Sequence, residues 1–259
     1  MNDYFKLLSK IYNDGQSITA RGVTFRELID QKIVIDPSYN YYSCPSRHIE
    51  NTSKYLFGEL AWYLSGNRYI NGINKYSKFW NQIANKDETA NSNYGYLVFY
   101  RKKYEFTNYE WCLNSLISDK HSRQAVMLYN SKEFYYEGNK DFLCTQTQQF
   151  FIRNNELISI VNIRSSDAIK GLTFDIPWWS LVQQKLLLDL KTVRHNNLVL
   201  GDLIINIGSA HIYNKDLELV NKMLLEDRKF YKIMLFNNFK LVEDQKYYED
   251  NLNCIVGII

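Results

Sequence analysis

The stretch that decides the fold is Asp141–Trp179, which reads DFLCTQTQQFFIRNNELISIVNIRSSDAIKGLTFDIPWW. Two runs, at 145–152 and 157–163, are rich in β-branched and aromatic residues, and the turn-forming residues at 153–155 separate them. Pro177 suits the first position of a helix, and the apolar residues after it cover a broad face. We therefore expect a pair of strands followed by a helix that lies centrally in the fold.

The rest of the chain supplies helices and strands in clusters. Residues 4–12 have helical spacing, and a longer helical pattern runs from 45 to 65, where Gly66 ends it. Thr24 with Glu27 could form a capping box, but the KIVI run that follows is equally strand-like. Helices are also predicted near 77–84, 109–118 and 217–225, and strands at 124–129 and 203–207. This arrangement indicates an α+β fold rather than a βαβ series.

Length and composition limit the classes of protein that the chain can belong to. Its 259 residues, with 46% hydrophobic and 23% charged side chains and no internal repeat or linker, suit a single domain over 1–259. A net charge of +3 does not favour nucleic acid or an anionic membrane as a partner. The sequence shows no signal peptide and no long apolar run, so we expect a soluble, cytoplasmic protein.

The cysteines are Cys44, Cys112, Cys144 and Cys254, and they are widely spaced. Without a CxxC pair or a Cys/His cluster, we expect neither a metal site nor a disulfide framework. A buried, unreactive thiol is the ordinary outcome for each cysteine. Cys144 differs because Arg164 is expected on the neighbouring strand, where it could lower the pKa of the thiol and hold a substrate phosphate.

Several separated motifs occur in an order typical of one enzyme family. They are GELAWYLSGN (58–67), NSNYG (91–95), the Ser122-Arg123 pair, CTQTQQ (144–149), NIRSSD (162–167) and GDLIINIGSAHIY (201–213). Together they resemble the thymidylate synthase superfamily. The resemblance implies a thymidylate synthase-like fold, in which a mixed β-sheet forms the dimer interface and helices surround a long central one. It also implies a homodimer with shared active sites.

The resemblance implies a role for each matching residue. Cys144 matches the catalytic nucleophile, Glu59 the residue that organises water and proton transfer, and Tyr94 the active-site tyrosine. The residues implied for binding are Arg164, Ser165 and Arg21 for the phosphate, Arg123 for the partner subunit's site, His211 and Tyr213 for the sugar hydroxyl, and Trp80, Asp167 and Gly171 for the folate.

Asp175 stands where the synthases of this superfamily have an asparagine that reads the pyrimidine. An amide complements the N3–H and O4 of uracil, whereas a carboxylate accepts from the amino group and protonated N3 of cytosine. Asp175 therefore indicates a cytosine nucleotide. Its alternative role is a helix N-cap, a position that aspartate favours.

Two further departures from the synthase motifs also favour a cytosine nucleotide. Thr145 replaces the histidine that follows the catalytic cysteine in synthases, and Ile163 replaces a glutamine. With Asp175, they resemble the deoxycytidylate hydroxymethylases, known chiefly from viruses that modify their DNA cytosines. Gln124 replaces a second phosphate-binding arginine, and Lys120 could supply the missing donor.

The resemblance implies a one-carbon transfer from 5,10-methylenetetrahydrofolate to C5 of dCMP, followed by addition of water, without a metal. The alternatives are synthase-type methylation of dUMP or dCMP, hydroxymethylation of CMP, and a catalytically silent nucleotide-binding relative. The apolar C-terminal tail could fold over the folate, as tails do in this family.

Overall fold

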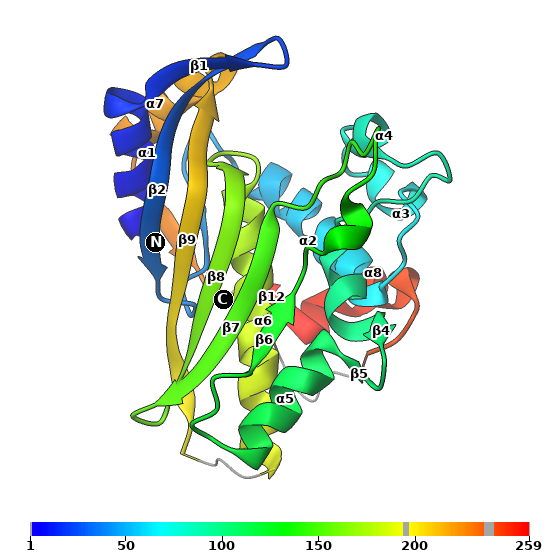
Figure 1. Cartoon of the computed structure of the whole chain (residues 1–259). Helices are drawn as coiled ribbons and strands as arrows, with labels where there is room; N and C mark the ends of the chain where they lie inside the picture. Colours follow the sequence, from blue (N-terminus) through cyan, green and yellow to red (C-terminus); the bar gives the residue numbers. More distant parts are fainter. Residues whose placement is uncertain (1, 194–196, 236–240, 259) are drawn as a thin grey trace.

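The fold is built on one six-stranded mixed sheet (Figure 1). The computed structural model describes residues 2–193, 197–235 and 241–258, with side chains up to residue 252. The strands lie in the order β1-β2-β9-β8-β7-β6, and all neighbours are antiparallel except β8 and β9, which are parallel. Their bounds are β1 (Gln16–Ala20), β2 (Val23–Ile35), β6 (Val126–Leu128), β7 (Thr145–Arg153), β8 (Glu156–Asp167) and β9 (Val199–Tyr213). The predicted strand pair is confirmed as β7 and β8.

The long helix α6 (Leu172–Val193) covers one face of this sheet (Figure 1). Its Gln183 side chain donates hydrogen bonds to the backbone oxygens of Leu157 and Gly201, at 2.8 and 3.0 Å, and so ties the helix to the parallel strand pair. Trp178 and Trp179 are fully buried. The predicted central helix is therefore confirmed. Beside it, α1 (Asn2–Asp14) packs on β2 and on α7 (Leu217–Leu225).

Helix α2 (Ile49–Ser65) forms a second layer and ends at Gly66, which has a positive φ of 66° as predicted. The NSNYG turn packs directly on the end of α2. A Cβ on Gly95 would lie 1.6 Å from the backbone oxygen of Tyr63, so only glycine fits there. The shorter elements are α3 (Asn71–Asn74), α4 (Trp80–Ile83), η1 (Tyr96–Tyr100), β4 (Lys102–Lys103), β5 (Phe106–Thr107), α5 (Asn108–Ser118), η2 (Lys132–Phe134) and η3 (Asn214–Asp216).

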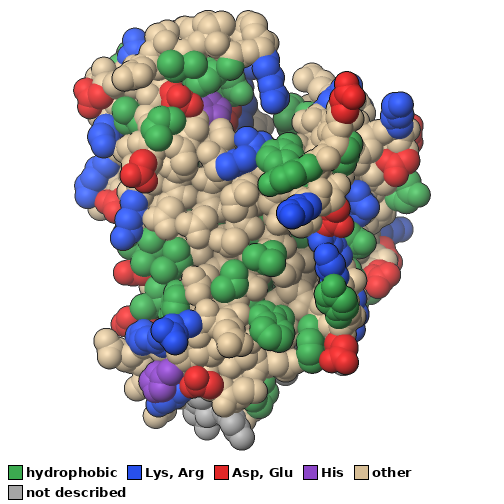
Figure 2. Space-filling model, viewed as in Figure 1, with side chains coloured by type: hydrophobic (Ala, Val, Ile, Leu, Met, Phe, Trp, Pro, Cys, Tyr) green, Lys and Arg blue, Asp and Glu red, His purple; other side chains and the backbone are tan. Residues whose placement is uncertain are grey.

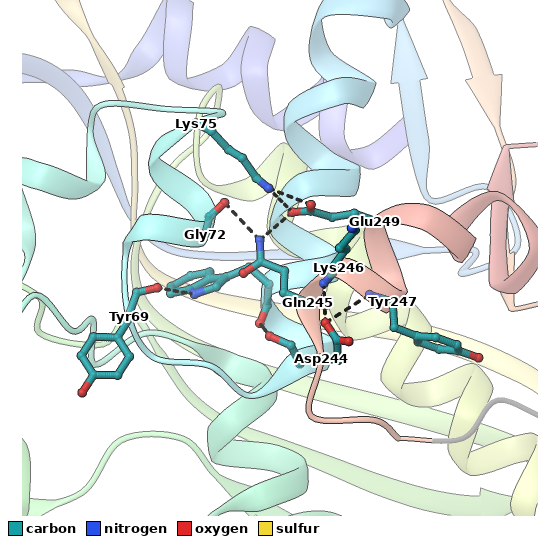
Figure 3. Close-up of polar contacts among 10 residues, drawn as sticks. Tyr69, Gly72, Lys75, Asp244, Gln245, Lys246, Tyr247 and Glu249 are labelled. Atoms are coloured by element: carbon teal, nitrogen blue, oxygen red, sulfur yellow. Dashed lines mark hydrogen bonds and ion pairs between the residues drawn. The ribbon is translucent and has the colours of Figure 1, made fainter.

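The C-terminal helix α8 (Gln245–Ile255) is fixed to α3 (Figure 3). The carboxylate of Asp244 accepts hydrogen bonds from backbone N–H groups at the start of α8. Gln245 donates to the backbone oxygen of Gly72 at 3.0 Å, and Lys75 forms an ion pair with Glu249 at 2.6 Å. These contacts connect the end of the chain to the segment that leads to α4.

Four short strands complete the fold: β3 (Tyr41–Ser43), β10 (Lys229–Tyr231), β11 (Ile233–Leu235) and β12 (Val256–Ile258). The tail contains β12, which pairs with β11; its place over the folate stays a prediction. The backbone N–H of Leu235 in β11 donates to Gln184, in the middle of α6, at 3.0 Å. The side chain of Cys254 lies outside the described residues.

One predicted element boundary is wrong: helix α6 begins at Leu172, so Pro177 lies inside it and not at its first position. The alternatives at Thr24 are decided in favour of the strand, because Thr24 lies in β2. Thr107 and Glu110 form a capping box at the start of α5.

In the part of the chain that the structure describes, no helix lies on the second face of the sheet (Figure 1). Uncharged side chains occupy the middle of this face, and most of the charged ones lie toward its edges (Figure 2). The half-buried or exposed residues of the inner strands include Ile158, Ile160, Asn162, Ile204 and Asn206.

Candidate active site

The thiol of Cys144 and the guanidinium of Arg164 are direct neighbours. Cys144 immediately precedes β7, and the backbone N–H of Arg164 in β8 donates to its carbonyl at 2.9 Å. Arg164 Nη2 lies 3.5 Å from Cys144 Sγ. The guanidinium is held by the backbone oxygens of Leu143 and Phe142, at 2.9 and 2.6 Å. The arginine is thus fixed beside the thiol, as the strand pair predicts.

The expected lowering of the thiol pKa is wrong. Burial raises the pKa of Cys144 to about 11, although Arg164 lowers it. The carboxyl groups of Asp175 and Asp141 raise this pKa further. One guanidinium at the edge of a desolvated thiol does not compensate for the loss of water, so at neutral pH the group is a thiol. Attack by sulfur therefore requires that the proton leaves as the new bond forms.

Glu59 faces the interior from α2 and is only 6% exposed. Tyr55, one turn earlier, donates its hydroxyl hydrogen to Glu59 Oε1 at 2.7 Å. Trp80 Nε1 in turn donates to the Tyr55 hydroxyl at 3.3 Å. Burial raises the pKa of Glu59 to about 7, and hydrogen bonds from Tyr55 and Tyr63 oppose this rise. A carboxyl group with such a pKa can both give and take a proton near neutral pH.

Asp175 lies in the first turn of α6, where its backbone N–H donates to the oxygen of Gly171 at 3.0 Å. Because Asp175 is inside the helix, the alternative role as an N-cap is wrong. Burial raises its pKa well above the usual range, and the nearby Glu59 raises it further.

Tyr94 completes the cluster. Its hydroxyl accepts from the backbone N–H of Thr145 at 3.5 Å, and its ring stacks on that of Tyr63 at 5.4 Å. Burial raises the pKa of Tyr94, and Asp175 and Cys144 add to this effect. The structure therefore brings together Cys144, Glu59, Asp175 and Tyr94 from separate parts of the chain.

A second group lies at the ends of β8 and β9. The rings of His211 and Tyr213 are 5.1 Å apart, and Asp167 is paired with His211 across the two strands. Burial lowers the pKa of His211, and Asp167 opposes this effect. For Tyr213, burial raises the pKa, and Arg21, in the turn between β1 and β2, lowers it. Asp167, His211, Tyr213 and Arg21 therefore lie near one another.

The loop between β8 and α6 is held by its own polar groups. Asp167 Oδ1 accepts from the backbone N–H groups of Ile169 and Lys170, at 2.8 and 3.1 Å. A Cβ on Gly171 would lie 3.0 Å from the backbone oxygen of Asp167, so this tight turn favours glycine. Ser165 is half-buried in β8 next to Arg164 and pairs with Ser209 of β9.

Arg123 does not join these residues. It is exposed in the loop before β6, and its backbone oxygen accepts from Gln149, five residues along the chain from Cys144. An open groove between α4 and the segment 133–140 also contains none of the predicted site residues. It is lined by charges of both signs.

Sequence reasoning missed the functional surroundings of Glu59. Tyr55 and Tyr63 belong to the apolar stripe of the predicted helix, but each is four residues from Glu59, a spacing that places all three on one helix face. This spacing is the signal that could have identified them.

In the described part of the chain, no group of three or more His, Cys, Asp or Glu side chains could hold a metal ion. No described helix is long and apolar enough to cross a membrane.

A family model for thymidylate synthase matches residues 2–252. The chain belongs to the thymidylate synthase family. It is a one-carbon transferase, and this family uses methylenetetrahydrofolate and acts on nucleoside monophosphates. The predicted α+β fold with a mixed sheet is likewise shown by a solved member: thermostable thymidylate synthase A from Bacillus subtilis superimposes with a TM-score of 0.75 at 17% identity, over 100% of this chain and 94% of that one.

Curated members of the thymidylate synthase family include two kinds of relative. Deoxycytidylate 5-hydroxymethyltransferase of Enterobacteria phage T4 is 31% identical over 206 residues, which cover 77% of this chain and 80% of the relative. Thymidylate synthase of Francisella tularensis subsp. holarctica (strain FTNF002-00 / FTA) is 26% identical over 244 residues, covering 86% of this chain and 84% of the relative.

Proposed function

We propose that this family member is a deoxycytidylate 5-hydroxymethyltransferase, which converts dCMP, 5,10-methylenetetrahydrofolate and water to 5-hydroxymethyl-dCMP and tetrahydrofolate. The observation that carries the proposal is Asp175: a carboxyl group, not an amide, stands beside Cys144 and Glu59. Burial raises its pKa and so favours the protonated form, and a protonated Asp175 can pass its proton to N3 of cytosine. The carboxylate then accepts from both N3–H and the amino group. The 31% identity to the phage T4 deoxycytidylate 5-hydroxymethyltransferase supports the same conclusion.

The residues around the site have distinct roles in this reaction. Cys144 Sγ, which is half-buried, adds to C6 of the ring as its proton passes to water, and this addition turns C5 into a nucleophile. Arg164 stabilises the developing thiolate, and Arg164, Ser165 and Arg21 are proposed to bind the phosphate. His211 and Tyr213 are placed to bond the sugar hydroxyl.

The residues near Trp80 and Asp167 fit a folate. Asp167 uses Oδ1 for its own turn, which leaves Oδ2 to accept from a pterin N–H group. The rings of Trp80, Tyr55 and Phe174 offer an aromatic wall, with the latter two 4.7 Å apart. We therefore propose Trp80, Asp167 and Gly171 as folate contacts. The bound folate supplies a one-carbon unit to C5.

The identity of the product depends on Glu59. After transfer, the exocyclic methylene accepts water in a hydroxymethylase and hydride in a synthase. Glu59, with a pKa of about 7, can remove a proton from water at neutral pH and return it later. This property would serve the addition of water; because the synthases share this glutamate, the 31% identity to the phage T4 hydroxymethyltransferase is what favours the hydroxymethyl product.

We further propose a homodimer formed through the helix-free face of the sheet, on which uncharged side chains predominate (Figure 2). Arg123, exposed and away from its own Cys144, would reach the partner subunit's site. The phage relative also suggests a virus-encoded protein that acts in the host cytoplasm.

The test is to incubate the protein with tetrahydrofolate, formaldehyde and dCMP, dUMP or CMP, and to weigh the products. Addition of a hydroxymethyl group to dCMP is expected. Addition of a methyl group together with dihydrofolate absorbance would identify a synthase, turnover of CMP in preference would identify a ribonucleotide enzyme, and no turnover would favour a binding protein. Asp175→Asn should shift the preference from dCMP toward dUMP; an unchanged preference would refute the role of Asp175.

A further inference from the structure

A chain of hydrogen bonds joins the proposed folate side of the site to Glu59. Trp80 Nε1 donates to the hydroxyl of Tyr55 at 3.3 Å, and this hydroxyl donates to Glu59 Oε1 at 2.7 Å. The second bond is short, as expected for a phenol that donates to a carboxylate. The direction is fixed, because an indole N–H can only donate and therefore forces the phenol hydrogen toward Glu59.

The Tyr55 side chain is held from three elements. It belongs to α2, it receives the hydrogen bond from α4, and its ring meets Phe174 of α6 edge-on at 4.7 Å. Phe174 is adjacent in sequence to Asp175. Because all three elements fix the ring, its hydroxyl has one orientation, and the Glu59 oxygen that it contacts is fixed too.

We propose that Tyr55 is a positioning residue for Glu59: it fixes one carboxylate oxygen, favours the ionised form, and makes the state of Glu59 depend on the contact with Trp80. This inference rests on the proposed function for its catalytic consequence, and on the hydrogen-bond geometry alone for its effect on Glu59. Tyr55 itself does not touch the reacting atoms and is not a catalytic residue.

The other groups that face Glu59 define what removal of the Tyr55 hydroxyl would do. From α2, Tyr63 also donates to Glu59 and lowers its pKa. From α6, Asp175 is close enough that the two carboxyl groups repel each other, and Tyr94 and Cys144 lie beyond Asp175. No cation is among these neighbours. Phenol hydrogen bonds are therefore what stabilises the ionised form of Glu59, and Tyr55→Phe removes one of them.

The experiment compares wild type, Tyr55→Phe and the matched control Tyr109→Phe. Tyr109 is also buried and also donates to a carboxylate, Asp189, at 2.6 Å, but on α5, outside the site. For Tyr55→Phe we expect kcat to fall about 10- to 100-fold, with KM for dCMP within about 2-fold. The acid limb of the kcat profile should move up by about 1 pH unit, and Tyr109→Phe should leave it in place.

Titration of the Glu59 side chain, labelled with carbon-13 and assigned with Glu59→Gln, provides a measurement that needs no turnover. We expect a higher midpoint in Tyr55→Phe and an unchanged one in Tyr109→Phe. An unchanged midpoint in Tyr55→Phe, or an equal shift in the control, would overturn the inference. If Tyr55→Phe does not fold, Trp80→Phe should raise the midpoint by a smaller amount, and no change there would also overturn it. Failure of the wild type to turn over dCMP would reject the proposed function, while this titration would still decide the role of Tyr55.

Discussion

Replacement of Glu59 by glutamine should stabilise the protein in a pH-dependent manner. Burial moves the pKa of Glu59 from 4.5 to about 7. Because the folded pKa is raised, the contribution of this group is complete below about pH 4.5 and is lost as pH rises through about 7. At 1.36 kcal/mol per pH unit, this difference corresponds to about 3 kcal/mol of stability lost at alkaline pH.

Glutamine has the same shape and cannot ionise, and its amide oxygen can still accept from Tyr55. Glu59→Gln should therefore match wild type at about pH 4 and exceed it by about 3 kcal/mol at about pH 8.5. For a chain of this size, the gain is about 5 to 10 °C in Tm. Activity should fall severely, because the amide cannot exchange a proton.

Thermal or denaturant unfolding at the two pH values measures this gain, with Glu105→Gln, an exposed turn residue, as the control. The control should change stability by less than about 0.5 kcal/mol at either pH. Equal stability of Glu59→Gln and wild type at alkaline pH would refute the reasoning. It would mean that ionisation of Glu59 costs no more free energy in the folded protein than in the unfolded chain.

Three further predictions concern the thiol, the base reader and a helix cap. Arg164→Gln should slow alkylation of Cys144 by iodoacetamide about 3- to 10-fold, and Asp175→Asn should speed it by a similar factor. The reason is that Arg164 lowers the pKa of the thiol, whereas Asp175 raises it. Rates that change in the same direction in both variants would contradict this electrostatic explanation. Binding of dCMP should take up fewer protons from the buffer in wild type than in Asp175→Asn, since burial favours the protonated carboxyl group, which can donate to N3; calorimetry in buffers of different ionisation enthalpy measures this uptake, and equal uptake would contradict the role of Asp175 as proton donor. Thr107→Ala should cost about 1 kcal/mol in denaturant unfolding through loss of the bond from the Glu110 N–H, and a neutral result would show that the capping box contributes nothing.

Much of the fold could be predicted from local patterns. The strand pair β7 and β8 follows from two runs of β-branched and aromatic residues separated by a turn. The end of α2 follows from Gly66, which can adopt a left-handed conformation, and the central position of α6 follows from its broad apolar face. The start of α6 could not be predicted, because Asp167 holds the preceding loop through its side chain and starts the helix before Pro177. A local hydrogen bond from a side chain to the backbone leaves no hydrophobic periodicity in the sequence.

The candidate site could likewise be predicted only in part. Motif order indicated which residues meet, including Cys144 and Asp175, but their protonation depends on burial, which spacing does not measure. The thiol pKa was therefore predicted in the wrong direction. The phenols at positions 55 and 63 were within reach of sequence reasoning, since four-residue spacing on a helix places them beside Glu59.

The contact between α8 and α3 bears on how the protein is made. Gln245 and Glu249, close to the end of the chain, bind Gly72 and Lys75 in the segment before Trp80 (Figure 3). Because a chain is synthesised from its N-terminus, the residues that fix this segment leave the ribosome long after Glu59 and Trp80 have emerged. The segment around Trp80 therefore lacks these contacts at first, and a premature stop near residue 243 should give a protein in which the segment is not fixed and activity is low.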